Sequence, residues 1–442
     1  MLRPTQSAII FVQQLGRGLR KCVNKSYVSV IDFIGNYENN FFIPIALYGD
    51  NSYNKDNLRR ALSGGSTGIP GSSTIQIDEI AREKIFDAIN KTSFKQFKFL
   101  KEEYTKLKLR LAKIPSMMDF VKNEFIDPFL FIDYSGTYYT FKCKIEKKEI
   151  ELSAEQMCSL QFVSLEFARG IRLHELLILK LLSEKASVSL DDFSSELLKF
   201  DVKLTDQDLF GACNTLSPDF YTQNDKKKYG GIKYVELDKS KNQISRTSEY
   251  ENLLKSSIYK AELLDCLSYG IKRASLKPDE MLEDDNLILY RKYTRKDVCK
   301  LLNWKSDCSS TIYGYKTETS YPEYSCPIFV TYKKSDEISD TTKYDDVFID
   351  NSRFSWMSRS RRTSASDEVA KIIAQPQNNI RVMLFVKKND DEGSDFYYLG
   401  DMHYDSFEDT KMNTADGKVD VVNIQFDMKT PVPQNLYNYL EA

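Results

Sequence analysis

The spacing of hydrophobic residues predicts helices through the middle of the chain. Between residues 75 and 126, apolar residues recur at helical spacing, with lysine and glutamate on the other faces. Residues 173–182 show a strong amphipathic pattern, and two further helices are expected at 189–200 and 205–216. The last of these begins at Thr205, with Asp208 at the spacing of a capping box.

Residues 220–237 predict a β-hairpin directly after these helices. Runs rich in aromatic and β-branched residues at 220–223 and 232–237 flank a polar turn that carries Lys226, Lys227 and Lys228. Three helices followed by two strands, over about 171–240, is the order of a winged-helix unit, in which turn lysines contact the DNA backbone. The alternative is a winged helix that mediates protein contacts and carries a solvated lysine run.

From about residue 286 onward the pattern changes to strands. Short runs of β-branched and aromatic residues lie at 312–315, 328–332, 381–386, 396–399 and 422–428. Their number and spacing predict a closed or sandwiched β domain. Trp304 follows a helix that opens around residues 294–297, and we expect it in the core.

One stretch of this β-rich region carries candidate binding chemistry. Residues 353–362 contain two aromatic residues, no acid, and four arginines: Arg353, Arg359, Arg361 and Arg362. Such interleaving can neutralise phosphate while an aromatic ring, here Trp356, stacks on a base. The alternative is that Phe354 and Trp356 fill the domain interior while the arginines decorate a loop.

Composition narrows the class of protein. The 442 residues include 62 basic and 64 acidic residues, so a uniformly cationic nucleic-acid coat protein is excluded and DNA contacts require local patches. The eight cysteines form no Cys-x-x-Cys pair, which suits reduced thiols, and no metal site is predicted. The two histidines, His174 and His403, exclude the paired His-x-Lys motifs of phospholipase-D-type nucleases, and we expect His174 to be packed. No signal peptide or membrane-spanning run is visible, so a cytoplasmic location is expected.

The N-terminal fifty residues carry a short motif. Gln13, Gly16, Arg17 and Arg20 have the Gln-x-x-Gly-Arg-x-x-Arg spacing, and residues 27–35 have the β-branched pattern of a strand in a parallel sheet. The motif resembles the arginine-finger motif of superfamily 2 helicases. That resemblance implies that Arg17 and Arg20 neutralise charge on the γ-phosphoryl group of ATP held between two RecA-like lobes, within an ATP-contacting motif completed by Gln13 and Gly16.

The sequence contains no Gly-x-x-x-x-Gly-Lys-Ser/Thr loop to cradle phosphates. Asp367 and Glu368 follow a Ser/Arg-rich stretch rather than an apolar strand, so we do not assign them as a magnesium-binding Asp-Glu box. We therefore expect no ATP hydrolysis by this chain alone. ATP and Mg²⁺ would be bound only with the missing helicase lobes, supplied in cis or in trans.

Several further segments resemble known proteins. Residues 1–73 resemble the end of a bacterial DEAD/DEAH-type helicase similar to the R subunit of type III restriction enzymes. From roughly residue 90 the chain resembles the domain of unknown function 3427 region attached to such helicases, notably at 293–298, 312–315, 326–332 and 396–400. In that family a phospholipase-D-type nuclease often precedes the helicase, and the proteins are implicated in restriction or defence. This sequence lacks that nuclease, the first RecA-like lobe and most of the second.

We therefore expect a mixed, multidomain protein. Its parts would be a remnant of the second RecA-like helicase lobe at 1–50, a helical bridge at 51–150, a helical region with the winged-helix-like unit at 151–285, and a β-rich, barrel-like DNA-recognition domain at 286–442. The expected function is the C-terminal portion of an ATP-dependent DNA helicase or translocase of a restriction or defence type. A stand-alone DNA-binding or modified-base reader and a structural adaptor for a nuclease or partner subunit are the alternatives.

Overall fold

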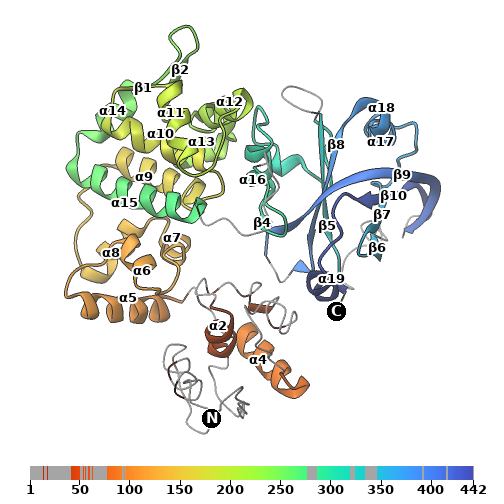
Figure 1. Ribbon diagram of the computed structural model, residues 1–442, viewed down its shortest axis with the longest axis horizontal. Coiled ribbons are helices and arrows are strands. Elements are labelled where there is room, and N and C mark those ends of the chain that lie inside the picture. The colour runs from red at the N-terminus through yellow and green to blue at the C-terminus, as the bar shows by residue number, and fades with distance from the viewer. Residues whose placement is uncertain are drawn as a thin grey trace, which may run out of the picture. The chain divides into compact units, whose positions relative to one another are not determined.

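The computed structural model describes residues 13, 17, 41–49, 53, 55, 58–59, 62, 77–91, 94, 96–275, 286–318, 324–333, 346–390, 393–414 and 417–441 (Figure 1). The chain divides into two compact units, Met1–Tyr134 with Gln434–Ala442 and a larger unit, Ser135–Pro433. Most of the expected RecA-like remnant, including the strand expected at 27–35, lies outside the described residues. No helix in the described ranges is long and apolar enough to cross a membrane.

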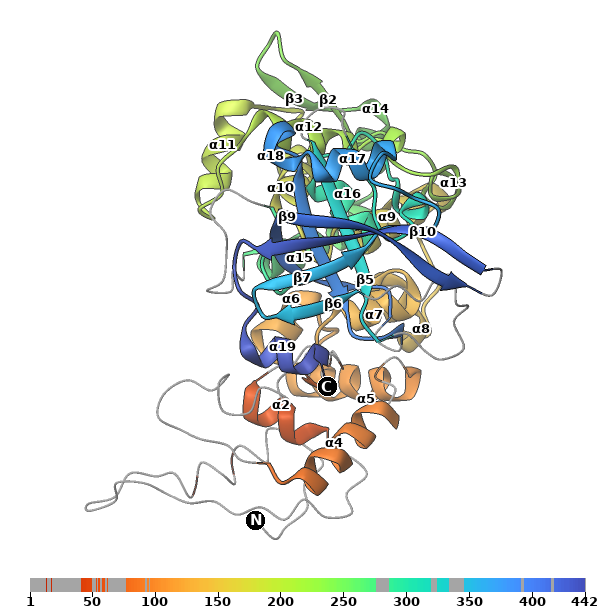
Figure 2. The ribbon, with the colours of Figure 1, turned by 90° about the vertical axis from the view of Figure 1, so that its right-hand side faces the viewer.

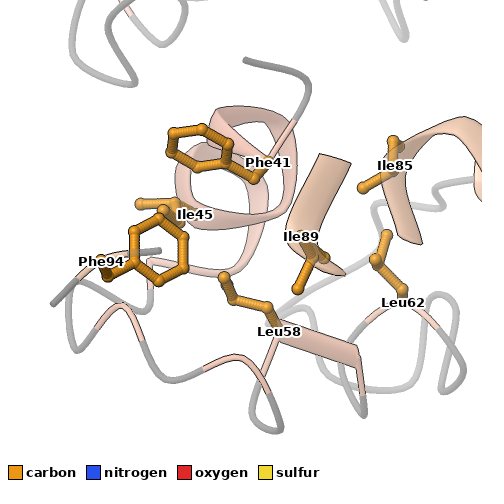
Figure 3. Close-up of a cluster of buried hydrophobic side chains, with 7 residues drawn as sticks. All are labelled: Phe41, Ile45, Leu58, Leu62, Ile85, Ile89 and Phe94. Carbon is orange, nitrogen blue, oxygen red and sulfur yellow. The ribbon is translucent and has the colours of Figure 1, made fainter. Parts of the chain in front are cut away.

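The described part of the smaller unit is helical, as the periodicity of 75–126 predicts. Its helices are α2 (Phe42–Tyr48), α4 (Glu79–Lys91), α5 (Phe97–Leu111), α6 (Met117–Lys122), α7 (Phe129–Ser135, which ends at the unit boundary) and α19 (Gln434–Glu441). A capping box between Ser116 and Asp119 begins α6. Figure 3 shows one buried apolar cluster of this unit, made by Phe41, Ile45, Leu58, Leu62, Ile85, Ile89 and Phe94.

The larger unit begins with a helical half, residues 135–275. It contains α8 (Tyr138–Glu146), α9 (Ala154–Glu166), α10 (Leu173–Glu184), α11 (Leu190–Leu198), α12 (Asp206–Thr215), η2 (Pro218–Phe220), α13 (Gln223–Tyr229), α14 (Ser248–Leu254) and α15 (Ser257–Ala274). The three helices expected at 173–216 are confirmed, and Thr205 caps α12 by accepting a hydrogen bond from the Asp208 backbone N–H at 3.0 Å.

Three short strands complete the helical half: β1 (Ser187–Ser189), β2 (Val235–Asp238) and β3 (Gln243–Arg246). They form an antiparallel sheet in the order β1-β3-β2, with Ser245 of β3 opposite both Ser187 and Glu236. The hairpin therefore joins β2 to β3, and its tip lies at 239–242, beyond the turn that the sequence predicts.

The predicted placement of Lys226, Lys227 and Lys228 in a hairpin turn is wrong. Residues 220–223 form no strand, and the three lysines lie in the last turn of helix α13. The local reason is a second cap, because the Thr222 hydroxyl accepts from the Asp225 backbone N–H and starts a helix where the pattern predicts a turn. Tyr221, expected in the first strand, and Tyr229, expected in the turn, instead pack edge-on against Phe162 of α9.

The sheet half of the larger unit, residues 286–433, contains β4 (Lys292–Tyr293), β5 (Ser325–Thr331), β6 (Val347–Asp350), β7 (Arg353–Met357), β8 (Arg381–Lys387), β9 (Phe396–Thr414) and β10 (Gly417–Met428). These strands form one curled, half-barrel sheet in the order β5-β8-β9-β10-β7-β6, with β4 paired to β9 (Figure 2). Pairing is antiparallel except between β5 and β8. Bulges interrupt the register at Gln425/Phe426 and Leu384/Phe385, as expected where strands bend.

Helices connect and flank these strands. They are α16 (Arg295–Leu301), η3 (Ser309–Thr311), α17 (Asp367–Ile373) and α18 (Gln375–Asn378). The expected core position of Trp304 is confirmed, since its indole N–H donates to the buried Ser325 hydroxyl at 3.0 Å. The strand expected at 312–315 is replaced by isolated bridges around Gly314, whose φ of +86° turns the chain.

Candidate functional site

The finger motif is described only in part. Gln13 and Arg17 lie in helical backbone and are exposed. Gly16 and Arg20 lie outside the described residues. The assignment of Arg17 and Arg20 as fingers, and of Gln13 and Gly16 as ATP contacts, therefore stays a prediction.

The three lysines of α13 form the first candidate surface. Lys227 and Lys228 are exposed and Lys226 is half-buried, with the Lys228 ammonium 4.8 Å from the centre of the Tyr229 ring. No carboxylate among the described residues forms an ion pair with any of the three. Asp225 precedes them on the same helix, but its carboxylate binds Lys296 at 2.8 Å. The end of α13 is therefore a local concentration of positive charge, which we call the α13 lysines.

The aromatic residues of the arginine-rich stretch 353–362 are not placed for the base stacking that the sequence suggests. Its aromatic residues face the interior: Phe354 is fully buried and Trp356 is 3% exposed. Trp356 meets Tyr315 edge-on, with ring centres 4.8 Å apart, and pairs with Ile424 across β7 and β10. The alternative interpretation, in which the aromatics fill the domain interior, is the one that the structure supports, because a ring held inside the sheet cannot stack on a base.

Most of the arginines in this stretch have internal partners. Arg359 donates to the Tyr313 carbonyl at 2.8 Å and to the Tyr315 carbonyl, and its ion pair with Glu368 is 3.3 Å long. Arg362 binds the same carboxylate at 2.6 Å. Glu368 therefore anchors two guanidinium groups, which gives this carboxylate a structural role. Arg353, paired with Asp350 at 2.8 Å, and Arg361 are exposed.

Helix α12, the third of the three predicted helices, faces the sheet half. Its first turn is acidic, and the Asp208 carboxylate accepts from Asn303 at 3.0 Å and from Asn286 at 2.5 Å. Asn303 also accepts from Arg172 at 2.5 Å. An added Cβ at Gly211 would collide with the Asn303 carboxamide, so the two segments are in close contact. In a helix-turn-helix protein the recognition helix enters the DNA groove. Helix α12 would have that place in a winged-helix unit, but this face of α12 is covered by the segment around Asn303 and carries negative charge, so it does not suit contact with DNA.

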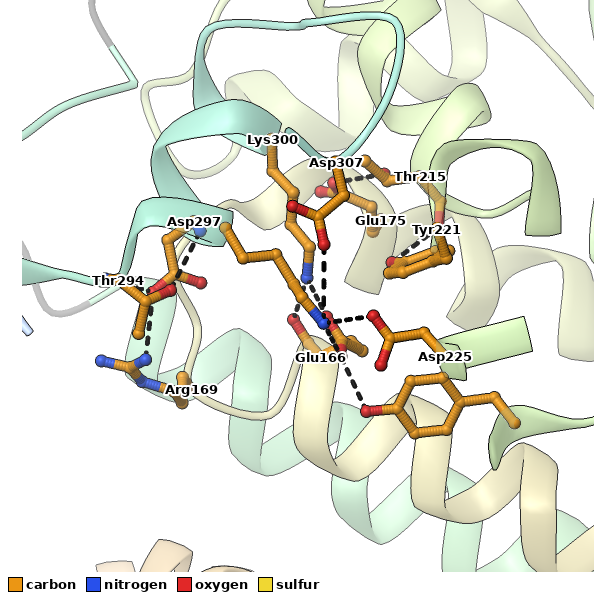
Figure 4. A network of polar contacts seen from close by, with 12 residues as sticks. Glu166, Arg169, Glu175, Thr215, Tyr221, Asp225, Thr294, Asp297, Lys300 and Asp307 are labelled. Carbon is orange, nitrogen blue, oxygen red and sulfur yellow. Dashed lines mark hydrogen bonds and ion pairs between the residues drawn. The ribbon is translucent and has the colours of Figure 1, made fainter. Parts of the chain in front are cut away.

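A buried ionic network joins the helical half to α16 (Figure 4). Glu166, at the end of α9, binds the Lys300 ammonium at 2.5 Å and the Lys296 ammonium at 3.3 Å, and it accepts from the Tyr229 hydroxyl at 2.7 Å. Burial by itself would raise the pKa of Glu166, but the two ammonium groups outweigh burial and lower the pKa to about 2. Lys296 also lies 3.9 Å from Asp307.

A second cluster lies beside the first. Arg169 binds Asp297 of α16 at 3.0 Å and Asp395, just before β9, at 2.8 Å. Arg291 donates to the carbonyls of Arg169 and Gly170 at 3.3 and 3.1 Å. Together the two clusters hold the turn after α9 against the beginning of the sheet half.

A polar cleft of about 410 Å³ opens along these clusters. Its lining residues come from both halves: Leu165, Glu166, Arg169, Thr294, Arg295, Lys296, Asp297, Ser309, Ser310 and Ser394. Arg169 and Lys296 already have carboxylate partners, whereas Arg295 lies 5.4 and 5.1 Å from the ring centres of Phe329 and Phe396. Within the described ranges, no group of three histidine, cysteine or acidic side chains is arranged to hold a metal ion.

Sequence reasoning did not select the residues of this cleft. Arg295, Lys296 and Asp297 belong to the segment 293–298 that supports the family resemblance, which is the feature of the sequence that could have pointed to this cleft. The partners Glu166, Arg169 and Asp395 are distant in the chain and carry no local motif. His174 is packed as expected, 1% exposed, with neither ring nitrogen hydrogen-bonded, and burial lowers its pKa to about 4.

Comparisons with known proteins assign two regions of the chain. Residues 287–440 match the family described as domain of unknown function (DUF3427), as the resemblance predicts for this region. Residues 100–277 match a separate domain of unknown function (DUF8090), so the single region expected from about residue 90 is two. No curated protein matches the chain.

Among solved structures, one similar chain is titled "Sulfur binding domain and SRA domain of ScoMcrA complexed with phosphorothioated DNA". The similarity has 10% sequence identity and covers 63% of this chain and 96% of that chain. Its TM-score is 0.21.

Proposed function

We propose that this chain is the C-terminal, DNA-contacting portion of an ATP-dependent helicase or translocase of a restriction or defence type. In this proposal the larger unit binds the DNA backbone, and the α13 lysines are its main phosphate contacts. Arg17 and Arg20, with Gln13 and Gly16, act on ATP and Mg²⁺ that are held by the remaining helicase sequence. The chain alone then hydrolyses no ATP.

The observation that carries the DNA-binding part is the charge balance at the end of α13. The only acid of this helix is engaged by Lys296, while Lys226, Lys227 and Lys228 have no carboxylate partner among the described residues. Flexible ammonium groups without a carboxylate partner are available to neutralise phosphates, and each contact releases counterions from the DNA.

The helical half supports a specific orientation on DNA. This half has the element order α10-β1-α11-α12-β2-β3 and the sheet order β1-β3-β2, and we propose that it acts as a winged-helix-like unit. Because α12 is acidic and covered by the segment around Asn303, the unit contacts DNA through α13 rather than through a groove-reading helix. Backbone contacts of this kind bind DNA with little sequence preference.

In the sheet half, we propose Arg353 and Arg361 as phosphate contacts, because both are exposed. The partner of Arg353, Asp350, is itself 42% exposed, so a phosphate can compete with this surface pair. Trp356, Arg359 and Arg362 are left out because their side chains are buried or bound internally. A modified-base reader built on Trp356 would need an exposed ring, so we do not propose it.

The test is DNA binding by the full chain, measured as fluorescence anisotropy of a labelled 30-base-pair duplex across a salt titration. Replacing the three α13 lysines by alanine should weaken binding and make the log-log salt dependence shallower by about 2–3, since each lost phosphate contact changes the slope by roughly 0.9. A matched variant removes three other exposed lysines, Lys411, Lys418 and Lys429, from β9, β10 and the residue after it. This control should leave the slope unchanged.

Two results would overturn the proposal. The first is the absence of wild-type binding at low salt, which would favour the structural-adaptor alternative. The second is an equal loss of affinity in both triple variants, which would show that only net charge matters. ATP turnover well above background by the chain alone would separately refute the dependence on other helicase sequence.

A further inference from the structure

The cleft between the two halves of the larger unit contains one cation that differs from its neighbours. Arg169 forms ion pairs with Asp297 and Asp395, and Lys296 forms ion pairs with Glu166 and Asp225. Arg295 forms no ion pair with any carboxylate of the described residues, and its Nε atom is buried without a hydrogen-bond partner. The cleft therefore holds a guanidinium group whose hydrogen-bonding capacity is unused.

The surroundings of Arg295 make a guanidinium group without ion pairs or hydrogen bonds energetically unfavourable. Its guanidinium lies against the rings of Phe329 and Phe396, and burial lowers its pKa without any carboxylate acting in the opposite direction. Contact with the two rings recovers part of the lost hydration. A partly desolvated guanidinium still lacks the charge-assisted hydrogen bonds that usually compensate it.

The remaining lining suits a compact anion. Three serines, Ser309, Ser310 and Ser394, border the same 410 Å³ space. The Ser394 hydroxyl donates to Asp395 at 3.2 Å, so the hydroxyls of Ser309 and Ser310 are the ones that can donate to an anion. The carboxylates that also line it, Glu166 and Asp297, are each bound by a cation at 3.3 Å or less, so their repulsion of an anion is reduced. Guanidinium groups bind the oxygens of phosphate in bidentate fashion, and hydroxyl groups can donate to the same anion.

We propose that this cleft is a phosphate-binding site, with the Arg295 guanidinium as the principal ligand and the hydroxyls of Ser309 and Ser310 as secondary donors. The phosphate comes either from a nucleic-acid backbone or from a small phosphorylated or inorganic ion. The backbone source rests on the DNA binding proposed above: Asp225, which binds the cleft residue Lys296, precedes the α13 lysines on one short helix.

The first experiment uses inorganic phosphate and the full chain. Unfolding of the larger unit can be followed by tryptophan fluorescence, because Trp304 and Trp356, the two tryptophans of the sequence, both lie in it. At constant ionic strength, phosphate at ten times its dissociation constant should raise the wild-type Tm by roughly 2–5 °C. Arg295→Met keeps an apolar stem against the two rings and removes the charge. It should melt at the wild-type temperature or higher without phosphate, and it should gain nothing from phosphate.

The second experiment separates the two sources of phosphate. If a DNA phosphate occupies the cleft, Arg295→Met should weaken duplex binding and reduce the salt slope by about 1. If Arg295→Met loses the phosphate response but binds DNA as the wild type does, the site takes a small phosphate, and DNA binding by the α13 lysines stands. If the wild type binds no DNA, the proposed function fails. The phosphate-dependent rise in Tm still shows whether the cleft binds phosphate.

Any of three outcomes overturns the inference. One is an equal phosphate-dependent rise in Tm for wild type and Arg295→Met, and another is the absence of such a rise in the wild type together with unchanged DNA binding by the variant. A large loss of stability in Arg295→Met without phosphate would also refute it, because Arg295 would then be a structural residue. The triple variant of Lys411, Lys418 and Lys429 serves as control and should keep the full phosphate response.

Discussion

Replacing Glu166 by glutamine tests whether the ionic network holds the two halves of the larger unit together. Glu166 is buried, with 6% of its side chain exposed, and contacts Lys296, Lys300 and Tyr229. Its pKa is lowered from the usual 4.5 to about 2, and each tenfold change in proton affinity is worth about 1.4 kcal/mol. The ionised carboxylate thus stabilises the fold by about 3 kcal/mol, close to the roughly 3–5 kcal/mol expected when one partner of a buried ion pair is removed.

The sign of the pH dependence follows from the lowered pKa. Above about pH 5, Glu166 is ionised in the folded and unfolded states, and the whole stabilisation is present. As the pH falls towards 2, the unfolded state takes up the proton first, so the stabilisation disappears. Glu166→Gln should therefore be about 3 kcal/mol less stable than wild type at pH 7, and the difference should shrink steadily below pH 5.

The assay is urea unfolding of the full chain followed by tryptophan fluorescence, which reports on the larger unit alone. The matched control is Glu251→Gln, because Glu251 is 54% exposed and pairs with Arg246 at 3.3 Å. Exposed pairs contribute about 0–1 kcal/mol, so this variant should stay near wild type. The stabilising role of the ionised Glu166 carboxylate is refuted if the two glutamine variants are equally stable at pH 7, or if the Glu166→Gln difference persists undiminished at pH 3.

Three further predictions concern packing and thiol chemistry. Gly211→Ala, normally stabilising in a helix, should cost about 1–3 kcal/mol here, because its Cβ meets the Asn303 carboxamide; a stabilised variant would contradict this close contact. Trp356→Ala should destabilise the larger unit by about 3–5 kcal/mol in chemical unfolding, and a cost below 1 kcal/mol would show that the ring is not core. Burial raises the pKa values of Cys213 and Cys266 to about 12, so both should resist alkylation by iodoacetamide at pH 8 until the protein unfolds; rapid labelling detected by mass spectrometry would refute this.

Local patterns were sufficient where a segment's own chemistry decides its conformation. Helix α12 begins at Thr205 as its capping pattern predicts, and four strands of the sheet half appear where β-branched and aromatic residues cluster. Residues 220–229 show the limit of such patterns. The aromatic and β-branched residues at 220–223 fit a strand, but Thr222 caps a helix and Tyr221 and Tyr229 pack against Phe162. Packing against a distant helix outweighed local strand preference, which is a weak guide in itself.

The candidate sites also depend partly on local sequence and partly on tertiary structure. The sequence alone identified the Gln-x-x-Gly-Arg-x-x-Arg spacing, the lysine run, the arginine-rich stretch and the β-rich character of the C-terminal region, because composition and spacing carry these features. Tertiary structure decided which charges are available. It placed Trp356 inside the sheet, bound Arg359 and Arg362 to Glu368, and neutralised Asp225 beside the α13 lysines. It also left Arg295 without a carboxylate partner in a cleft built from segments more than a hundred residues apart. Ion pairing and burial depend on which distant side chains meet, and local sequence cannot encode that.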